Sequence, residues 1–117
     1  MAIHGIGVDV VDLARFTETL ERTPTMRTRL FTPKERDLPI ESLAGRFAAK
    51  EALAKAMRAP AGVSWQDFEV SNTPRGAPEF VLHGAAPGRL RELGITVVHL
   101  SISHDTTVAT AFVVAEC

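Results

Sequence analysis

Apolar and polar positions follow a strand period in some segments of the chain and a helical period in others. Strand patterns cover residues 3–10, 79–82, 95–103 and 107–114, and a turn with a short strand is expected over 64–70. Helical patterns cover 13–22, 42–58 and 85–93, with a shorter helical piece over 25–30. Because the two kinds of element occur in mixed order and the last two strands form a hairpin, the pattern predicts an α+β fold.

Capping residues set the expected ends of the helices. Asp12 is a candidate N-cap for the first helix, and the stretch TPKE over 32–35 resembles another helix start. Ser42 is the candidate cap of the longest helix, and APAG over 59–62 is expected to break it.

The first strand, IHGIGVDVV over 3–11, is expected to be buried although it carries Asp9. Alternate residues of a strand share a face, so Gly5, Gly7 and Asp9 point the same way. Glycine inside a strand often marks the close approach of a ligand or of another backbone. Two explanations stay open: a helix packs tightly over the glycines and Asp9 caps the next element of the chain, or Asp9 belongs to a ligand site.

The longest helix, LAGRFAAKEALAKAM over 43–57, is apolar or small on nearly all sides and is therefore expected to be largely buried. Its charges are Arg46, Lys50, Glu51 and Lys55. A solvated pair between Glu51 and Lys55 is the simple interpretation. Three cations around one anion on a helix with no broad polar face instead suit phosphates, with the carboxylate holding a metal that bridges them.

If this helix packs over the face that holds Gly5 and Gly7, Asp9 and Glu51 converge. Two carboxylates are too few for a closed metal cage, but they suit Mg²⁺, which keeps waters and takes phosphate oxygens as further ligands. The combination indicates phosphoryl or phosphopantetheinyl chemistry.

Composition restricts the number of domains, the kinds of partner and the cellular location that we expect. The 117 residues fit one domain, 1–117, with a single core, and the net charge of −1 favours neither nucleic acid nor a membrane as partner. The single cysteine, Cys117, excludes an internal disulfide and suits a reducing cytoplasm. The N-terminal MAIHGIG lacks the features of a signal peptide, and no apolar run is long enough for a membrane span.

Three segments together resemble a known family. IGVDVVDLAR (6–15), RFAAKEALAKA (46–56) and VVHLSISHD (97–105) are similar to signature blocks of the holo-[acyl-carrier-protein] synthases, the small group of the 4'-phosphopantetheinyl transferase superfamily. Their order, their spacing and the chain length agree with that family, so the resemblance covers essentially the whole chain. TPKERDLPIES (32–42) looks short for the family, so any contacts made there are in doubt.

The resemblance implies a fold and a reaction. The fold is an antiparallel sheet packed on a long central helix. The enzyme moves 4'-phosphopantetheine from coenzyme A to a serine of apo-acyl carrier protein in fatty acid biosynthesis, with Mg²⁺, and leaves adenosine 3',5'-bisphosphate. It also implies a homotrimer with active sites at subunit interfaces.

The resemblance further assigns roles to single residues. Asp9 and Glu51 match the metal carboxylates and, with Lys55, form the catalytic set. The positions matched to coenzyme A binding are Arg46, Lys50, Lys55, Ser103 and His104. For Lys50 the choice between a structural role and a phosphate contact stays open. Arg15 matches a basic position that meets the acidic helix of the carrier protein.

The implied mechanism needs no nucleophile from the enzyme, because the carrier's serine attacks the pyrophosphate. Positioning and electrostatic stabilisation supply the catalysis. Glu51, Asp9 and a water are all candidates to take the serine proton. The alternative from another class is a regulatory subunit that binds a nucleotide or coenzyme A; it would keep Lys55 and His104 without needing both carboxylates.

Overall fold

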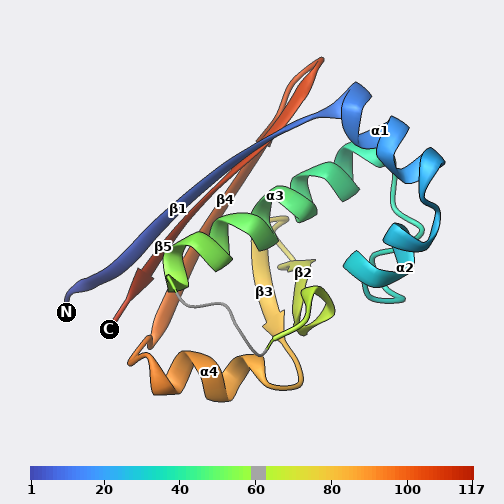
Figure 1. Cartoon of the computed structure of the whole chain (residues 1–117). Coiled ribbons are helices and arrows are strands. Elements are labelled where there is room, and N and C mark those ends of the chain that lie inside the picture. Colours follow the sequence, from blue (N-terminus) through green and yellow to red (C-terminus); the bar gives the residue numbers. More distant parts are fainter. Residues whose placement is uncertain (59–62) are drawn as a thin grey trace.

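The structure is a computed structural model that describes residues 1–58 and 63–117 (Figure 1). The elements are, in chain order, β1 (Ile3–Asp12), α1 (Leu13–Arg22), α2 (Thr25–Leu30), α3 (Ile40–Met57), the 3-10 turn η1 (Trp65–Asp67), β2 (Phe68–Asn72), β3 (Pro78–Leu82), α4 (Ala86–Glu92), β4 (Val97–His104) and β5 (Val108–Glu116). The expected break over 59–62 lies outside the described residues. None of the described helices is long and apolar enough to cross a membrane.

Two antiparallel sheets and one long helix organise the chain. β1, β5 and β4 form a three-stranded sheet in that order, and β2 pairs with β3 in a separate hairpin. Helix α3 lies along one face of the larger sheet, chiefly against β1 and β5, and α1 and α2 follow at one end (Figure 1). The α+β fold expected from the sequence, with an antiparallel sheet on a long central helix, is confirmed.

The first helix begins as its cap predicts, because a carboxylate oxygen of Asp12 accepts a hydrogen bond from the backbone N–H of Arg15 at 2.9 Å. The longest helix begins two residues earlier than expected. Its first turn closes on Pro39, whose carbonyl accepts from the N–H of Leu43, so Ser42 lies inside the helix and is not its cap. The stretch 32–35 forms turns, not a helix.

The central contact of the fold is the packing of α3 on β1. A Cβ atom placed on Gly5 would overlap the carbonyl oxygen of Ala56, and one on Gly7 would overlap that of Ala52. Backbone therefore lies directly against backbone, as the close approach at strand glycines predicts. The alanines of α3 allow this approach because they add little bulk on the side that faces the strand.

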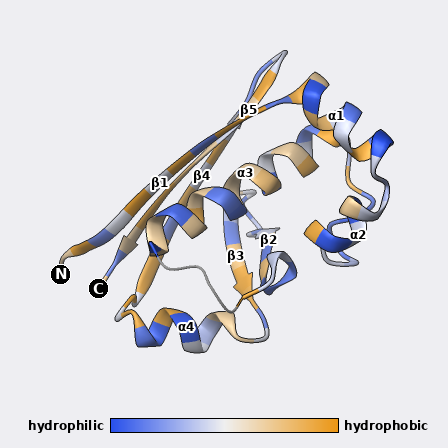
Figure 2. Cartoon of the chain, viewed as in Figure 1, coloured by the Kyte–Doolittle hydropathy of each residue, from blue (hydrophilic) through white to orange (hydrophobic). Residues whose placement is uncertain are grey.

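The opposite face of β1 is not buried, so the expectation of a buried strand is correct for the face toward α3 and wrong for this one. Ile6, Val8 and Val10 point away from α3, and Phe112 lies beside Val8 on β5. These four side chains, here called the outer strip, are between 47% and 63% exposed. Figure 2 shows hydrophobic residues along these strands. The alternation predicted by the strand pattern is present, but burial on that side would need a further surface.

The contact between α3 and β1 yields a first prediction. Gly7→Ala is expected to destabilise the fold by about 3 kcal/mol or more, because the added methyl group meets backbone atoms that cannot move alone. Urea denaturation measures the change in the free energy of unfolding.

The matched control is Gly88→Ala in α4, where the nearest atom to a new Cβ would be 3.8 Å away. This substitution is expected to leave stability unchanged or raise it by about 0.5–1 kcal/mol, since alanine is the better helix former. Equal effects of the two substitutions would contradict the proposed contact.

Candidate active site

A pocket of about 430 Å³ opens between the end of β1, helix α1 and the middle of α3. We call it the carboxylate pocket. Asp9, Glu51 and Lys55 line its polar part, and Arg15 stands among its lining residues on α1. The apolar part is formed by Val10, Val11, Phe16, Met26 and Phe47. Charged groups thus meet an apolar surface in one depression.

Asp9 reaches this pocket because it shares a strand face with Gly5 and Gly7, the face that α3 covers. Lys55, on α3, donates a hydrogen bond to Asp9 Oδ1 at 3.1 Å and another to the carbonyl of Val8 at 2.9 Å. The side chain of Asp9 is 19% exposed and that of Lys55 is 52% exposed. The ion pair of Lys55 therefore crosses from helix to strand, and the simple pair with Glu51 along the helix is not what forms.

Glu51 faces the same pocket from α3. Burial raises the pKa of Glu51 above its ordinary value, the negative charge of Asp9 raises it further, and Lys55 opposes the shift. The two carboxylates are thus close enough to repel one another. The convergence of Asp9 and Glu51 expected from the sequence is present.

This arrangement suits a divalent cation with oxygen ligands, because a positive ion would relieve the repulsion between the two carboxylates. In the part of the chain that the structure describes, no group of three or more His, Cys, Asp or Glu side chains is arranged to hold a metal. An ion bound between Asp9 and Glu51 would therefore take its other ligands from water or substrate, which fits Mg²⁺ best.

A second pocket, of about 300 Å³, lies between α3, the β2–β3 hairpin and β4. We call it the hairpin pocket. Arg46 and His104 line it together with Asn72. Arg46 donates through Nε to the carbonyl of Val70 at 3.3 Å and through Nη2 to Asn72 Oδ1 at 2.9 Å. Burial lowers the pKa of Arg46, and the negative charges of Glu35 and Glu69 oppose that shift.

The two pockets share no lining residue, so the predicted site residues of a single chain lie in two separate pockets. Asp9, Glu51 and Lys55 belong to the carboxylate pocket, whereas Arg46 and His104 belong to the hairpin pocket. Ser103 is in neither lining. It is exposed on the outer face of the sheet, opposite to His104, because neighbouring strand residues point to opposite faces.

Lys50 is wholly buried and its ammonium group is fully used. It donates to the carbonyl of Leu30 at 2.7 Å, to Glu35 Oε1 at 2.7 Å and to the carbonyl of Trp65 at 3.1 Å. An ammonium group has three donors, so none is left for a phosphate. The coenzyme contact predicted for Lys50 is therefore not retained, and the structural alternative explains this residue.

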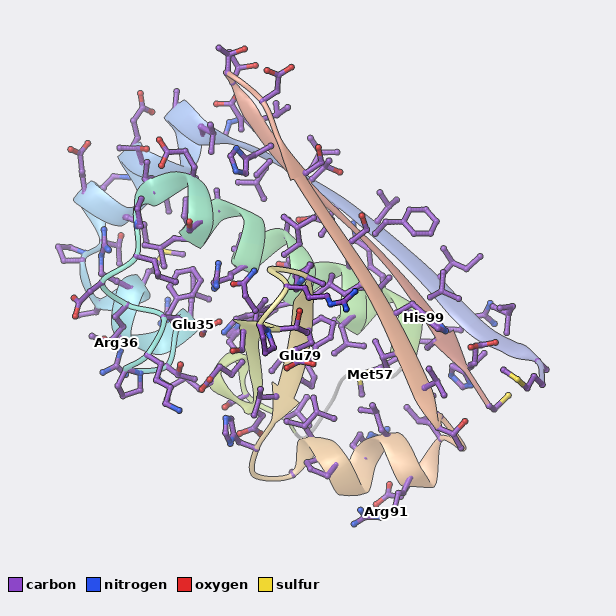
Figure 3. The ribbon with its side chains drawn as sticks, turned by 180° about the vertical axis from the view of Figure 1, so that it is seen from behind. Glu35, Arg36, Met57, Glu79, Arg91 and His99 are labelled. Carbon is purple, nitrogen blue, oxygen red and sulfur yellow. The ribbon has the colours of Figure 1, made fainter. Side chains whose placement is uncertain are left out.

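Glu35 is a functional candidate that the sequence patterns do not reveal. It lies on the segment between α2 and α3 (Figure 3) and is 2% exposed, paired with Lys50. The one signal in the sequence is Lys50 itself, because a lysine within the apolar arc of a buried helix needs an anionic partner. Which acid supplies the charge depends on the path of a turn-rich segment, and the helical pattern carries no information about that path.

The environment of Glu51 predicts how stability depends on pH. Its raised pKa means that the folded state holds this proton more tightly than the unfolded chain, so the stabilising effect of protonation is lost as pH rises through the raised value. Glu51→Gln should therefore raise the melting temperature of the metal-free protein at pH 7. The gain should shrink on acidification and vanish below the ordinary value of 4.5.

Thermal melts of both proteins between pH 4 and pH 8 check this expectation. Glu92→Gln is the control, since Glu92 is an exposed partner of Arg89 on α4. A gain for Glu51→Gln that is equal at pH 4 and pH 7 would show that the charge of Glu51 is not its cause.

Comparison with known proteins agrees with this architecture. A family model described as the 4'-phosphopantetheinyl transferase superfamily matches residues 5–111. A holo-[acyl-carrier-protein] synthase of Clavibacter sepedonicus is 57% identical over 114 residues, covering 97% of this chain and 96% of the relative. One from Micrococcus luteus is 56% identical over 116 residues, covering 97% of this chain and 92% of that protein.

Solved structures lead to the same family. The holo-[acyl-carrier-protein] synthase of Neisseria meningitidis superposes with a TM-score of 0.91 at 36% identity, covering 98% of this chain and 99% of that one. The Helicobacter pylori synthase in complex with coenzyme A gives a TM-score of 0.83 at 33% identity, covering 95% and 99%. The resemblance seen in the sequence is confirmed: the chain belongs to the holo-[acyl-carrier-protein] synthases, enzymes of the 4'-phosphopantetheinyl transferase superfamily.

Proposed function

We propose that this single-domain enzyme transfers 4'-phosphopantetheine from coenzyme A to a serine of apo-acyl carrier protein, with Mg²⁺, as a cytoplasmic step of fatty acid biosynthesis. The products are holo-acyl carrier protein and adenosine 3',5'-bisphosphate. The observation that carries the proposal is the meeting of Asp9 and Glu51 in one pocket beside Lys55. Relatives from Helicobacter pylori and Bacillus anthracis have been solved with coenzyme A, the latter as CoA (3',5'-ADP), which supports the same co-substrate here.

Asp9 and Glu51 would hold the magnesium ion, which when bound supplies positive charge to the pyrophosphate oxygens. Lys55 sits beside them and would donate to a phosphate oxygen, since its side chain is half exposed and lines the pocket. The serine oxygen of the carrier would bond to the phosphorus that bears the phosphopantetheine arm, and the pyrophosphate P–O bond would break to release adenosine 3',5'-bisphosphate. The serine proton would pass to one of the two carboxylates or to water. A subunit that only bound a nucleotide would not need both carboxylates, so this arrangement favours the enzyme over a regulatory protein.

A homotrimer with active sites between subunits would bring the two pockets together. The carboxylate pocket of one subunit lacks Arg46 and His104, which the family resemblance places near coenzyme A, and the hairpin pocket of a neighbour would supply both. The outer strip offers the apolar surface for such an assembly. Val10 belongs to both the outer strip and the lining of the carboxylate pocket, so a subunit packed on the strip would reach the site.

Arg15 is the proposed contact for the acidic helix of the carrier protein. It is exposed on α1, three residues after the cap Asp12, and lines the carboxylate pocket. A carrier held there would place its serine near Asp9 and Glu51. Two arginines in and after α2 are engaged within the chain: Arg36 donates to the carbonyls of Phe31 and Thr28, and Arg27 donates to that of Arg36.

Mass spectrometry tests the reaction directly. Incubation with coenzyme A, Mg²⁺ and an apo-acyl carrier protein should add roughly 340 Da to the carrier, the mass of the transferred arm, and only when a divalent ion is present. Asp9→Ala and Glu51→Ala are each expected to lower the rate by about 100-fold or more while circular dichroism stays unchanged. Glu92→Gln, an exposed acid on α4, should retain the activity.

A parent protein that adds no mass to any carrier tested would remove the proposed reaction. Near-normal rates for Asp9→Ala or Glu51→Ala would remove the metal assignment.

The role of Arg15 predicts a selective defect. Arg15→Glu is expected to raise the KM for the carrier protein by roughly tenfold and to leave the KM for coenzyme A unchanged, because charge complementarity acts on the encounter between proteins. Steady-state kinetics with each substrate varied in turn measures both constants. Arg91→Glu, a charge reversal at an exposed residue of α4, is the control (Figure 3). A raised KM for coenzyme A instead of the carrier protein in Arg15→Glu would contradict the assignment.

A further inference from the structure

The buried ion pair between Glu35 and Lys50 asks for an explanation beyond stability. Glu35 Oε1 and Lys50 Nζ are 2.7 Å apart, and their side chains are 2% and 0% exposed. Such a pair often stabilises a fold no better than well-packed apolar side chains, because both charges lose their hydration. Lys50 directly precedes Glu51 on α3. We therefore ask which neighbouring groups the ion pair holds in place.

The carboxylate of Glu35 joins three separate segments. Oε1 accepts from Lys50 and from the backbone N–H of Thr32 at 3.0 Å, whereas Oε2 accepts from the backbone N–H of Val70 at 2.9 Å. The segment between α2 and α3, the helix α3 and the strand β2 thus meet at one side chain. We call Glu35 and Lys50 together the clasp.

Val70 connects the clasp to Arg46 through its two backbone hydrogen bonds. The N–H of Val70 donates to Glu35, and the carbonyl of the same residue accepts from Arg46 Nε at 3.3 Å. Arg46 Nη2 also donates to Asn72 Oδ1 on the same strand. Val70 is therefore held on one side by the clasp and itself holds the guanidinium of Arg46 on the other side.

Arg46 uses only some of its N–H donors in hydrogen bonds within the described residues. Its two hydrogen bonds within the described residues use two of five N–H groups, and the guanidinium lines the hairpin pocket. The direction of the remaining donors depends on where Val70 and Asn72 lie. A shift of β2 relative to α3 would turn them, and Glu35 opposes such a shift because it bonds Lys50 of α3 and the N–H of Val70 in β2.

We propose that Glu35 is a positioning residue for coenzyme A: together with Lys50 it fixes Val70, and Val70 orients Arg46 toward the phosphates of the coenzyme. This inference rests on the proposed contact between Arg46 and coenzyme A. A loss of the clasp then weakens coenzyme binding and leaves the carboxylate pocket, and with it the chemical step, largely intact.

The test replaces both charges at once, because a single substitution would leave a buried charge without its partner. Glu35→Leu combined with Lys50→Met is expected to raise the KM for coenzyme A about tenfold, the loss of roughly one well-oriented charge-assisted hydrogen bond. The kcat and the KM for the carrier protein should stay within about twofold of the parent values, since neither depends on Arg46 in this scheme.

The milder variant Glu35→Asp keeps the charge for Lys50 but is one methylene shorter, so it cannot reach both Lys50 and Val70 as Glu35 does. It should raise the KM for coenzyme A in the same direction, about threefold. This variant decides the question if the double variant does not fold. Leu90→Ala, a buried residue of α4 outside both pockets, is the control for stability loss alone.

Arg46→Ala allows a double-mutant cycle between the clasp and Arg46. In that background the clasp substitutions should raise the KM for coenzyme A no further, because the group that they orient is already gone. An unchanged KM in folded clasp variants, or an equal further rise in the Arg46→Ala background, overturns the inference. If Arg46→Ala itself leaves the KM unchanged while the parent enzyme still modifies the carrier, the inference is overturned and the transfer reaction stands.

Discussion

The approach of α3 to β1 is the contact on which the rest of the structure depends. Carbonyl groups of Ala52 and Ala56 occupy the space that side chains at Gly5 and Gly7 would fill. Because the helix lies this close to the strand, Glu51 can share a pocket with Asp9, and Lys55 can bond the strand itself. Folding and the assembly of the proposed metal site are therefore consequences of the same contact.

Much of this arrangement could be predicted from the sequence, because it depends on local periodicity. The alternation that puts Gly5, Gly7 and Asp9 on one strand face, and the spacing of charges on a helix rich in alanine, together predict that Asp9 and Glu51 meet. The class of fold and the family are indicated by patterns of the same kind, and the fold and the comparisons confirm both.

The rest depends on how distant segments meet, which periodicity does not encode. A helical pattern cannot reveal that Pro39 is the residue on which the first turn of α3 closes, because the structure of the preceding turn decides where the helix begins. The same holds for Lys50, whose partner Glu35 is 15 residues away along the chain in an irregular segment. The separation of Arg46 and His104 from the carboxylates is likewise a property of the whole fold.

The outer strip has a consequence for the newly made chain. A lone subunit presents an open sheet face of Ile6, Val8, Val10 and Phe112 to solvent. Exposed apolar strands of this kind invite unspecific association, so the folded chain is at risk of aggregation as long as that face stays uncovered. In the proposed homotrimer that face would be covered. Dilution, which separates subunits, would then promote aggregation, and the solubility of the chain would depend on how quickly its copies associate.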